Sequence, residues 1–245
     1  MEESSLNKIS SGSRIVKASD DAAGLAISDQ LQSDISSLSQ AAATTQQVSS
    51  LLEIADGGLS RISDILQRMK SLAVQYNSGT LDATSQGYIN DEYSQLSTQI
   101  GLIVSSTQYN GTNLIDNSYN QTVVVGVDST DNIAVDLSGV DASTTGLGLP
   151  GSITGSADID TIDTAIGTLG GYRATVGALE SAVNFQSENI DTQLTNLSSA
   201  KSSIKDADIA EEQTNFTNYQ VLAEAATAAL AQANQMKSSL LTLLK

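Results

Sequence analysis

Residues 48–76 read VSSLLEIADGGLSRISDILQRMKSLAVQY, and this stretch decides the fold. Its apolar side chains follow one another at alternating intervals of four and three residues, which places them along one face of an α-helix. A seam of this kind forms where helices pack side by side. The seam consists of Val48, Leu52, Ala55, Leu59, Ile62, Leu66, Met69, Ala73 and Tyr76.

A second apolar repeat lies near the other end of the chain. One aliphatic residue recurs every seven positions, at Ile162, Leu169, Val176, Val183, Ile190, Leu197 and Ile204. Matching repeats in two separate stretches predict that the two halves of the chain pack against each other. We therefore expect a mainly α fold, a long antiparallel helical rod or coiled-coil bundle, with both repeats in its seam.

Gly57 and Gly58 interrupt the first repeat without shifting its phase. Each glycine inside a helix costs roughly 1 kcal/mol relative to alanine. We expect one continuous helix with a soft point there. The second glycine pair, Gly170 and Gly171, lies inside the other repeat, and neither pair joins a strand to a helix as a phosphate-binding loop would.

Capping and turn signals set the element boundaries. Acidic or hydroxyl-bearing residues mark the helix starts, and Asn, Ser and Gly mark the ends. Two short β-branched runs, 122–127 and 133–137, predict a small β-hairpin, followed by an irregular loop rich in Gly, Ser and Thr. The predicted helices run from about residue 20 to 77, 82 to 106, 158 or 160 to 203, and 206 to 244, and the loop spans 138–157.

The composition of the 245 residues limits the classes of function. The net charge is −17, and no Lys or Arg occurs between Ser71 and Tyr172. Nucleic acid is a poor partner for such a chain because phosphates bind cations. No run of 18 or more apolar residues occurs, so we expect no membrane insertion.

The chain has no His and no Cys, so no disulfide or thiolate chemistry is available. The usual zinc ligands and His-based acid–base catalysis are missing as well. We expect no enzyme activity, no catalytic residues, no metal and no cofactor. Two acidic groups could in principle bind calcium, but neither matches the twelve-residue loop pattern, and solvated loops are the simpler interpretation. These groups are Asp128, Asp131 and Asp136, and Asp158, Asp160 and Asp163.

Five spaced blocks of sequence resemble bacterial flagellins, in the order in which that family carries them. They cover residues 6–115 and 165–245. The blocks are ISSGSRI at 9–15 with ASDDAAG at 18–24, LQRMKSLAVQ at 66–75, TQYNGTNL at 107–114, IKDADIAEE at 204–212, and LAQANQ at 230–235.

The resemblance implies a structural subunit that stacks into the flagellar filament for swimming motility. It also implies secretion to the bacterial flagellum and cell surface, and other flagellin subunits, flagellar export proteins and cap proteins as partners. Residues 1–115 and 161–245 would then form a discontinuous helical domain, whose C-terminal helix 206–245 extends toward the filament core. Residues 116–160 would form a small hairpin and loop region that projects outward.

Two alternatives stay open at this point. The hook–filament junction protein shares the Asp-Asp block, although that relative usually has Pro where this chain has Ala22. A surface flagellin could also act as an adhesin through residues 116–160.

The family implies one further candidate surface. Many flagellins are recognised by Toll-like receptor 5 through a Gln-Arg-x-x-x-Leu block and a Glu on the next helix. Gln67, Arg68, Leu72 and Glu92 match it here, and Ser71 replaces an acid that is common in the family. The same surface lies at subunit contacts in the mature filament.

The chain differs from the family pattern before its Ser-Ser-Gly block, where flagellins usually carry a longer segment. In the family, that segment pairs with the C-terminal helix. The Ala-rich seam from Leu222 to Leu243 therefore lacks an obvious partner. We expect the chain not to polymerise alone.

Overall fold

The computed structural model describes the backbone of residues 2–243 and the side chains of residues 3–237. The fold is mainly α-helical, as the heptad repeats predict. Packing divides the chain into two compact units. Unit 1 comprises residues 1–36 and 194–245, and unit 2 comprises residues 37–193.

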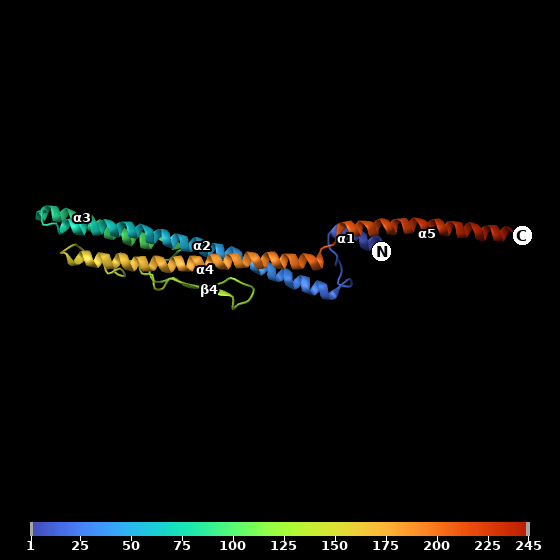
Figure 1. Cartoon of the computed structure of the whole chain (residues 1–245), viewed down its shortest axis with the longest axis horizontal. Coiled ribbons are helices and arrows are strands. Elements are labelled where there is room, and N and C mark those ends of the chain that lie inside the picture. Colours follow the sequence, from blue (N-terminus) through green and yellow to red (C-terminus); the bar gives the residue numbers. More distant parts are fainter. Residues whose placement is uncertain (1, 244–245) are drawn as a thin grey trace. The chain divides into compact units, whose positions relative to one another are not determined.

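Five helices and two small antiparallel hairpins make up the described part of the chain (Figure 1). No described helix is long and apolar enough to cross a membrane. The helices are α1 (Glu2–Ser11), α2 (Ala22–Tyr76), α3 (Ala83–Ser106), α4 (Ala157–Lys205) and α5 (Ile209–Leu243). The strands are β1 (Gln108–Tyr109), β2 (Thr112–Asn113), β3 (Asn120–Val124) and β4 (Asn132–Asp136).

Unit 2 is built on α3 and on the parts of α2 and α4 that lie within it (Figure 1). The turn after α2 leads to Asp82, whose side chain accepts a hydrogen bond from the Ser85 backbone N–H and caps α3. A capping oxygen satisfies a donor that has no partner inside the helix. The predicted bounds of α3 are confirmed to within one residue.

A loop clamp positions the start of α4. The Asn90 side chain accepts from the backbone N–H of Ile153 and donates to its carbonyl, at 2.8 and 3.2 Å. Five residues later, Asp158 accepts from the backbone N–H groups of Thr154 and Gly155. The carboxylate thereby satisfies donors at the helix start, where negative charge is also favoured.

Two hairpins follow α3. In β1–β2, Asn110 and Gly111 both have positive φ, at 49° and 79°, which is the backbone of a tight two-residue turn. The predicted hairpin is β3–β4, paired antiparallel with Val123 opposite Ile133. Its strands begin and end one to three residues before the predicted runs, because Val125 turns inward and is buried.

The core of unit 2 is a continuous cluster of buried apolar side chains. Thirteen of the predicted seam residues are buried within unit 2, while Tyr76, in unit 2, and Leu197 and Ile204, in unit 1, are half-buried. The buried seam residues are Val48, Leu52, Ala55, Leu59, Ile62, Leu66, Met69, Ala73, Ile162, Leu169, Val176, Val183 and Ile190.

Residues 116–160 contribute to this core. Six of their side chains join the buried cluster with the helices, and the Gln186 side chain donates to the Val125 carbonyl at 3.1 Å. Only the turn of the hairpin, residues 127–132, is exposed throughout. The segment is therefore packed against the helices for much of its length, and its outward projection stays a prediction. The six side chains are Val135, Leu137, Val140, Ala142, Leu147 and Ile153.

Unit 1 contains α1, which the sequence analysis did not predict, and α5. The two helices pack against each other. The predicted boundary between the last two helices is confirmed to within three residues, because α4 ends at Lys205 and α5 begins at Ile209. Residues 206–208 connect them, and Asp208 caps α5 by accepting from the Ala210 and Glu211 N–H groups.

Candidate functional site

The two terminal sequence blocks meet in unit 1. The loop 12–21 between α1 and α2 lies against the connection 204–208 between α4 and α5, and we call this contact the junction. Its residues come from opposite ends of the sequence. The junction is the densest set of long-range polar contacts in the described part of unit 1.

Backbone hydrogen bonds close the junction. The Arg14 N–H donates to the Lys205 carbonyl at 2.7 Å, and the Ala207 N–H donates to the Gly12 carbonyl at 3.0 Å. The Arg14 guanidinium donates to the Ile204 carbonyl at 2.7 Å. Carbonyls in the last turn of a helix have no partner inside it, so Arg14 satisfies two of those of α4.

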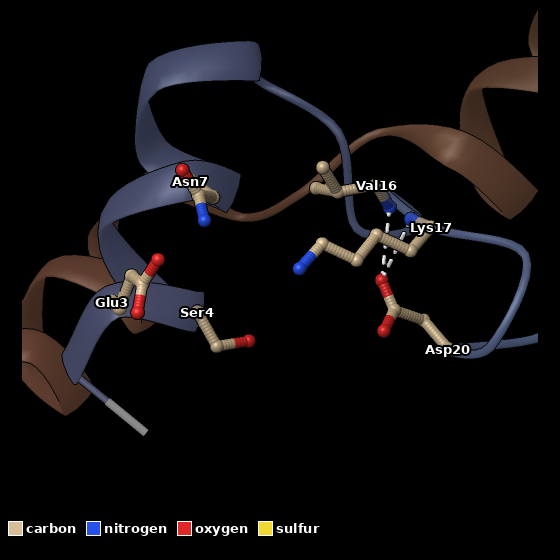
Figure 2. Close-up of a pocket in the computed structure, with 6 residues that line it drawn as sticks. All are labelled: Glu3, Ser4, Asn7, Val16, Lys17 and Asp20. Atoms are coloured by element: carbon tan, nitrogen blue, oxygen red, sulfur yellow. Dashed lines mark hydrogen bonds between the residues drawn. The ribbon is translucent and has the colours of Figure 1, made fainter.

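Asp20 and Asp21 hold the shape of the loop and do not form a catalytic dyad. Asp20 accepts from the backbone N–H groups of Val16 and Lys17, and these bonds, that of Lys17 first, lower the pKa of its carboxyl (Figure 2). Asp21 accepts from the Gly24 N–H and caps α2, as the acidic run predicts. The Asp20 carboxylate therefore binds the backbone of the loop, and the Asp21 carboxylate caps α2.

One apolar side chain anchors the loop to α2. Ile15 is buried, and a Cβ built on Gly24 would lie 2.8 Å from the Ile15 Cδ1 atom. A larger residue at position 24 would push this anchor out. The glycine in the ASDDAAG block is thus required by close packing in the first turn of α2.

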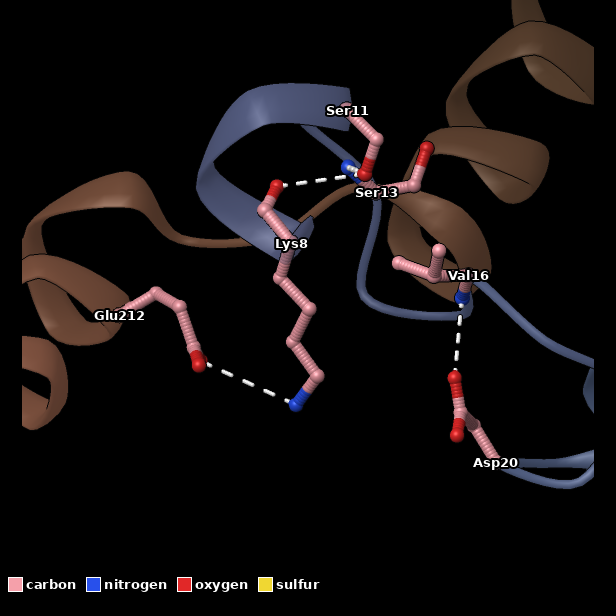
Figure 3. Close-up of polar contacts among 6 residues, drawn as sticks. All are labelled: Lys8, Ser11, Ser13, Val16, Asp20 and Glu212. Atoms are coloured by element: carbon pink, nitrogen blue, oxygen red, sulfur yellow. Dashed lines mark hydrogen bonds and ion pairs between the residues drawn. The ribbon is translucent and has the colours of Figure 1, made fainter. Parts of the chain in front are cut away.

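An ion pair joins α1 to α5. The Lys8 ammonium lies 3.9 Å from a carboxylate oxygen of Glu212, and both side chains are partly shielded from solvent (Figure 3). Such a pair contributes little free energy by itself, because solvent screens most of the attraction. The ion pair instead fixes the register in which α1 and α5 pack.

Lys17 extends from the loop toward α1 and lines a shallow polar pocket (Figure 2). The pocket also presents Glu3, Ser4 and Asn7 of α1, and Asp20 of the loop. Both acidic side chains and a lysine line the pocket, so it has no strong preference for a cation or an anion.

The outer part of α5 is an apolar surface facing solvent. Val221, Leu222, Leu230 and Met236 are each more than half exposed. Singly exposed apolar residues are common, but several along one helix indicate a contact surface. Leu222, Leu230 and Met236 lie within about 120° of one another around the helix axis, and we call these three residues the α5 face. The predicted seam continues to Leu243, beyond the side chains that the structure describes.

A second candidate surface lies on unit 2, where α2 and α3 run side by side. The Arg68 guanidinium donates twice to one Glu92 carboxylate oxygen, at 2.8 and 2.6 Å. Gln67 and Arg68 are exposed, Glu92 is partly exposed, and Leu72 is only 1% exposed. The structure therefore brings three of the four predicted residues to the surface and places Leu72 in the core.

No metal or catalytic constellation stands out among the described residues. They contain no group of three or more acids, His or Cys arranged to hold a metal ion. The acidic residues of the hairpin make local contacts instead. Asp136 accepts from the Ser138 N–H, and Asp131 lies against Gly126.

The sequence analysis identified both terminal blocks without predicting that they touch. Two of the three hydrogen bonds that make this contact join backbone groups, which any residue type provides, and the third uses the single side chain of Arg14, so side-chain periodicity carries no signal for it. The one available hint was composition: Ser, Gly and Asp cluster at 10–13 and again at 206–208, where the chain leaves its helices.

Family models match both ends of the chain. Residues 2–120 match the bacterial flagellin N-terminal helical region, and residues 159–244 match the bacterial flagellin C-terminal helical region. The two matched regions contain both halves of the junction.

Individual relatives agree with the family models. The chain is 37% identical to a flagellin of Halalkalibacterium halodurans over 98% of this chain and 90% of that protein. It is 34% identical to a flagellin of Bacillus subtilis over 98% and 91%. It is 33% identical to the flagellar filament 33 kDa core protein of Treponema phagedenis, also over 98% and 91%.

A solved structure shows the same fold. The crystal structure of Bacillus cereus flagellin superposes with a TM-score of 0.54 at 29% identity, covering 65% of this chain and 94% of that one.

Proposed function

Since this chain belongs to the bacterial flagellin family, we propose that its assembly surface is the α5 face, held in place by the junction. The chain is a structural subunit of the bacterial flagellar filament. Its relatives are flagellins and filament core proteins, which favours this role over a hook–filament junction protein or an adhesin. We assign it no catalytic role.

The exposed apolar area of α5 carries the proposal. Leu222 and Leu230 are 62% and 65% exposed, although both would gain free energy on burial. Copies that bury this face against neighbours, each using one surface against a different surface of the next, form a contact that repeats without closing. Such heterologous packing builds a filament rather than a ring.

The junction orders the start of α5 before the subunits assemble. It ties the end of α4 and the start of α5 to the loop before α2 through the three hydrogen bonds of Arg14 and Ala207. Binding surfaces gain affinity when they are ordered before contact. A fixed α5 start therefore lowers the cost of ordering the face on assembly.

The remaining partners follow from the family and belong to the same proposal. A filament subunit outside the cell requires secretion through the flagellar export apparatus and addition beneath a cap. The Arg68–Glu92 surface, with Gln67, would serve subunit contacts and recognition by Toll-like receptor 5. Leu72 would support that surface from the core.

Electron microscopy and pelleting of variants test the proposed surface. We expect Leu222→Asp and Leu230→Asp to abolish incorporation of the chain into ordered filaments. Ala231→Asp is the matched control, because that exposed residue lies on the opposite side of α5. Filaments of normal order from the Leu222→Asp variant would refute the role of this face.

A further inference from the structure

Unit 2 carries two adjacent glycine pairs inside long helices. Gly57 and Gly58 lie in α2, Gly170 and Gly171 lie in α4, and both helices run through them without a break. Glycine is the poorest helix former apart from proline, because its backbone loses the most freedom on ordering. Two such pairs in uninterrupted helices call for a physical reason.

The two pairs lie at the same level of the helix pair. The Arg173 guanidinium of α4 binds both carboxylate oxygens of Asp56 in α2, at 2.8 and 3.1 Å. Farther along, Lys70 of α2 pairs with Asp163 of α4. These contacts fix an antiparallel register in which the glycine pairs are within about one helical turn of each other.

Packing requires only one of the four glycines. A Cβ on Gly58 would lie 2.6 Å from the Thr107 hydroxyl oxygen, so this position must stay small. A Cβ on Gly57, Gly170 or Gly171 would meet no atom within 4 Å. Alanine would fit at those three positions and would favour the helix more.

The neighbours of the helix pair change at this level. Helix α3 ends at Ser106, and its cap residue Thr107 is the one that contacts Gly58. On one side of the level, α3 packs beside α2. On the other side, the β3–β4 hairpin lies beside α4, where Gln186 donates to the carbonyl of Val125 at the turn end of β3.

We infer that this level, residues 56–59 with 170–173, is a bend point at which α2 and α4 change curvature together. Glycine backbones absorb the change in dihedral angles, while the Arg173–Asp56 ion pair keeps the helices from sliding. The buried Leu59 and Leu169 hold the core closed on either helix. This property of unit 2 goes beyond the filament role and does not depend on it.

Amide exchange measures the local softness. We expect the amides at 57–60 and 170–173 to exchange faster than those of the neighbouring turns in the full chain. Gly57→Ala with Gly171→Ala, the level variant, slows exchange there about fivefold for each substitution, the factor that corresponds to the helix preference of alanine. Both substitutions fit without a clash, so the variant folds.

Distances between spin labels measure the bend itself. Ser39→Cys and Ser71→Cys place two labels on exposed sites of α2, about 48 Å apart in a straight helix, and the chain has no other cysteine. We expect the level variant to narrow the distribution of this distance. Gly87→Ala with Gly101→Ala is the matched control, because these glycines of α3 are also unobstructed.

The inference stands if the level variant narrows the distance distribution and the control variant leaves it as broad as in the parent chain. It is overturned if the parent chain and the level variant give the same width, or if the control narrows it equally.

Discussion

Unit 2 and unit 1 are both helical, yet they are held together in different ways. The core of unit 2 is an extended cluster of buried Leu, Ile and Val side chains. Among the described residues of unit 1, Ile15 is the one apolar side chain that is buried. Unit 1 instead relies on backbone hydrogen bonds and an ion pair. Hydrophobic burial is the dominant favourable contribution to folding, so we expect unit 2 to be the more stable part and unit 1 to gain more stability on assembly.

The largest expected difference comes from the same substitution made in each unit. Leu66→Ala removes a fully buried side chain from the seam and should destabilise the chain by about 2–5 kcal/mol. Leu222→Ala removes a side chain that is exposed on α5, and should change stability by less than about 0.5 kcal/mol. Urea unfolding followed by circular dichroism measures both. Equal losses would remove the distinction between the units.

Alkaline pH should weaken unit 2 through one tyrosine. Tyr93 is fully buried and its hydroxyl has no hydrogen-bond partner among the described residues; burial raises its pKa to about 12. A raised pKa means that the folded state favours the neutral form, so this contribution is complete below pH 10 and is lost as pH rises toward 12. The loss is about 2–3 kcal/mol.

Tyr93→Phe tests that assignment. The variant keeps the ring in the core and removes the ionisable group, so its stability should fall less than that of the parent chain between pH 10 and 12. Tyr88→Phe, at an exposed position on the same helix, is the control. A parallel decline in the parent chain and the Tyr93 variant would place the alkaline sensitivity elsewhere.

Short insertions should change the stability of the chain by different amounts in two loops of unit 2. The sequence alone favours tolerance between Gly146 and Gly151, but Leu147 is buried in the core there. A short Gly/Ser insertion after Leu147 should lower stability by about 1–3 kcal/mol by displacing that side chain. The same insertion between Ser129 and Thr130, in the exposed hairpin turn, should be nearly neutral because loop closure costs little. Thermal unfolding of both insertion variants checks this order.

The smallest expected effect concerns the junction. Hydrogen bonds lower the pKa of Asp20, so its contribution is present above the ordinary pKa near 3.8 and is lost as pH falls below it. Asp20→Asn should therefore loosen the loop 12–21 and speed its cleavage by a protease at pH 7. Asp29→Asn, an exposed acid on α2, serves as control. Unchanged cleavage in the Asp20 variant would show that this carboxylate does not shape the loop.

The sequence predicted the helical part well because periodicity reports directly on burial. The interval of four and three residues predicts which side of α2 is apolar, and Leu59, Ile62 and Leu66 are fully buried. Caps such as Asp82 are equally local signals. Both depend on residue type, which is what a sequence records.

The rest depended on contacts that residue type does not encode. The junction is closed by the backbone bonds of Arg14 to Lys205 and of Ala207 to Gly12, and the Arg14 side chain adds one bond, so no side-chain pattern in the sequence predicts this contact. The packing of Leu147 was hidden in the same way, since two Leu residues in a Gly- and Ser-rich loop are too few to define a periodicity. Long-range pairing of irregular segments is decided by the whole fold.

Hydrogen exchange tests the contrast between the two units most directly. We expect the amides of α5 between Val221 and Lys237 to exchange much faster than those of residues 48–76, because few buried contacts protect α5. In assembled filaments, the α5 amides should become protected while those of 48–76 change little. Equal protection of both segments in the isolated chain would contradict the account.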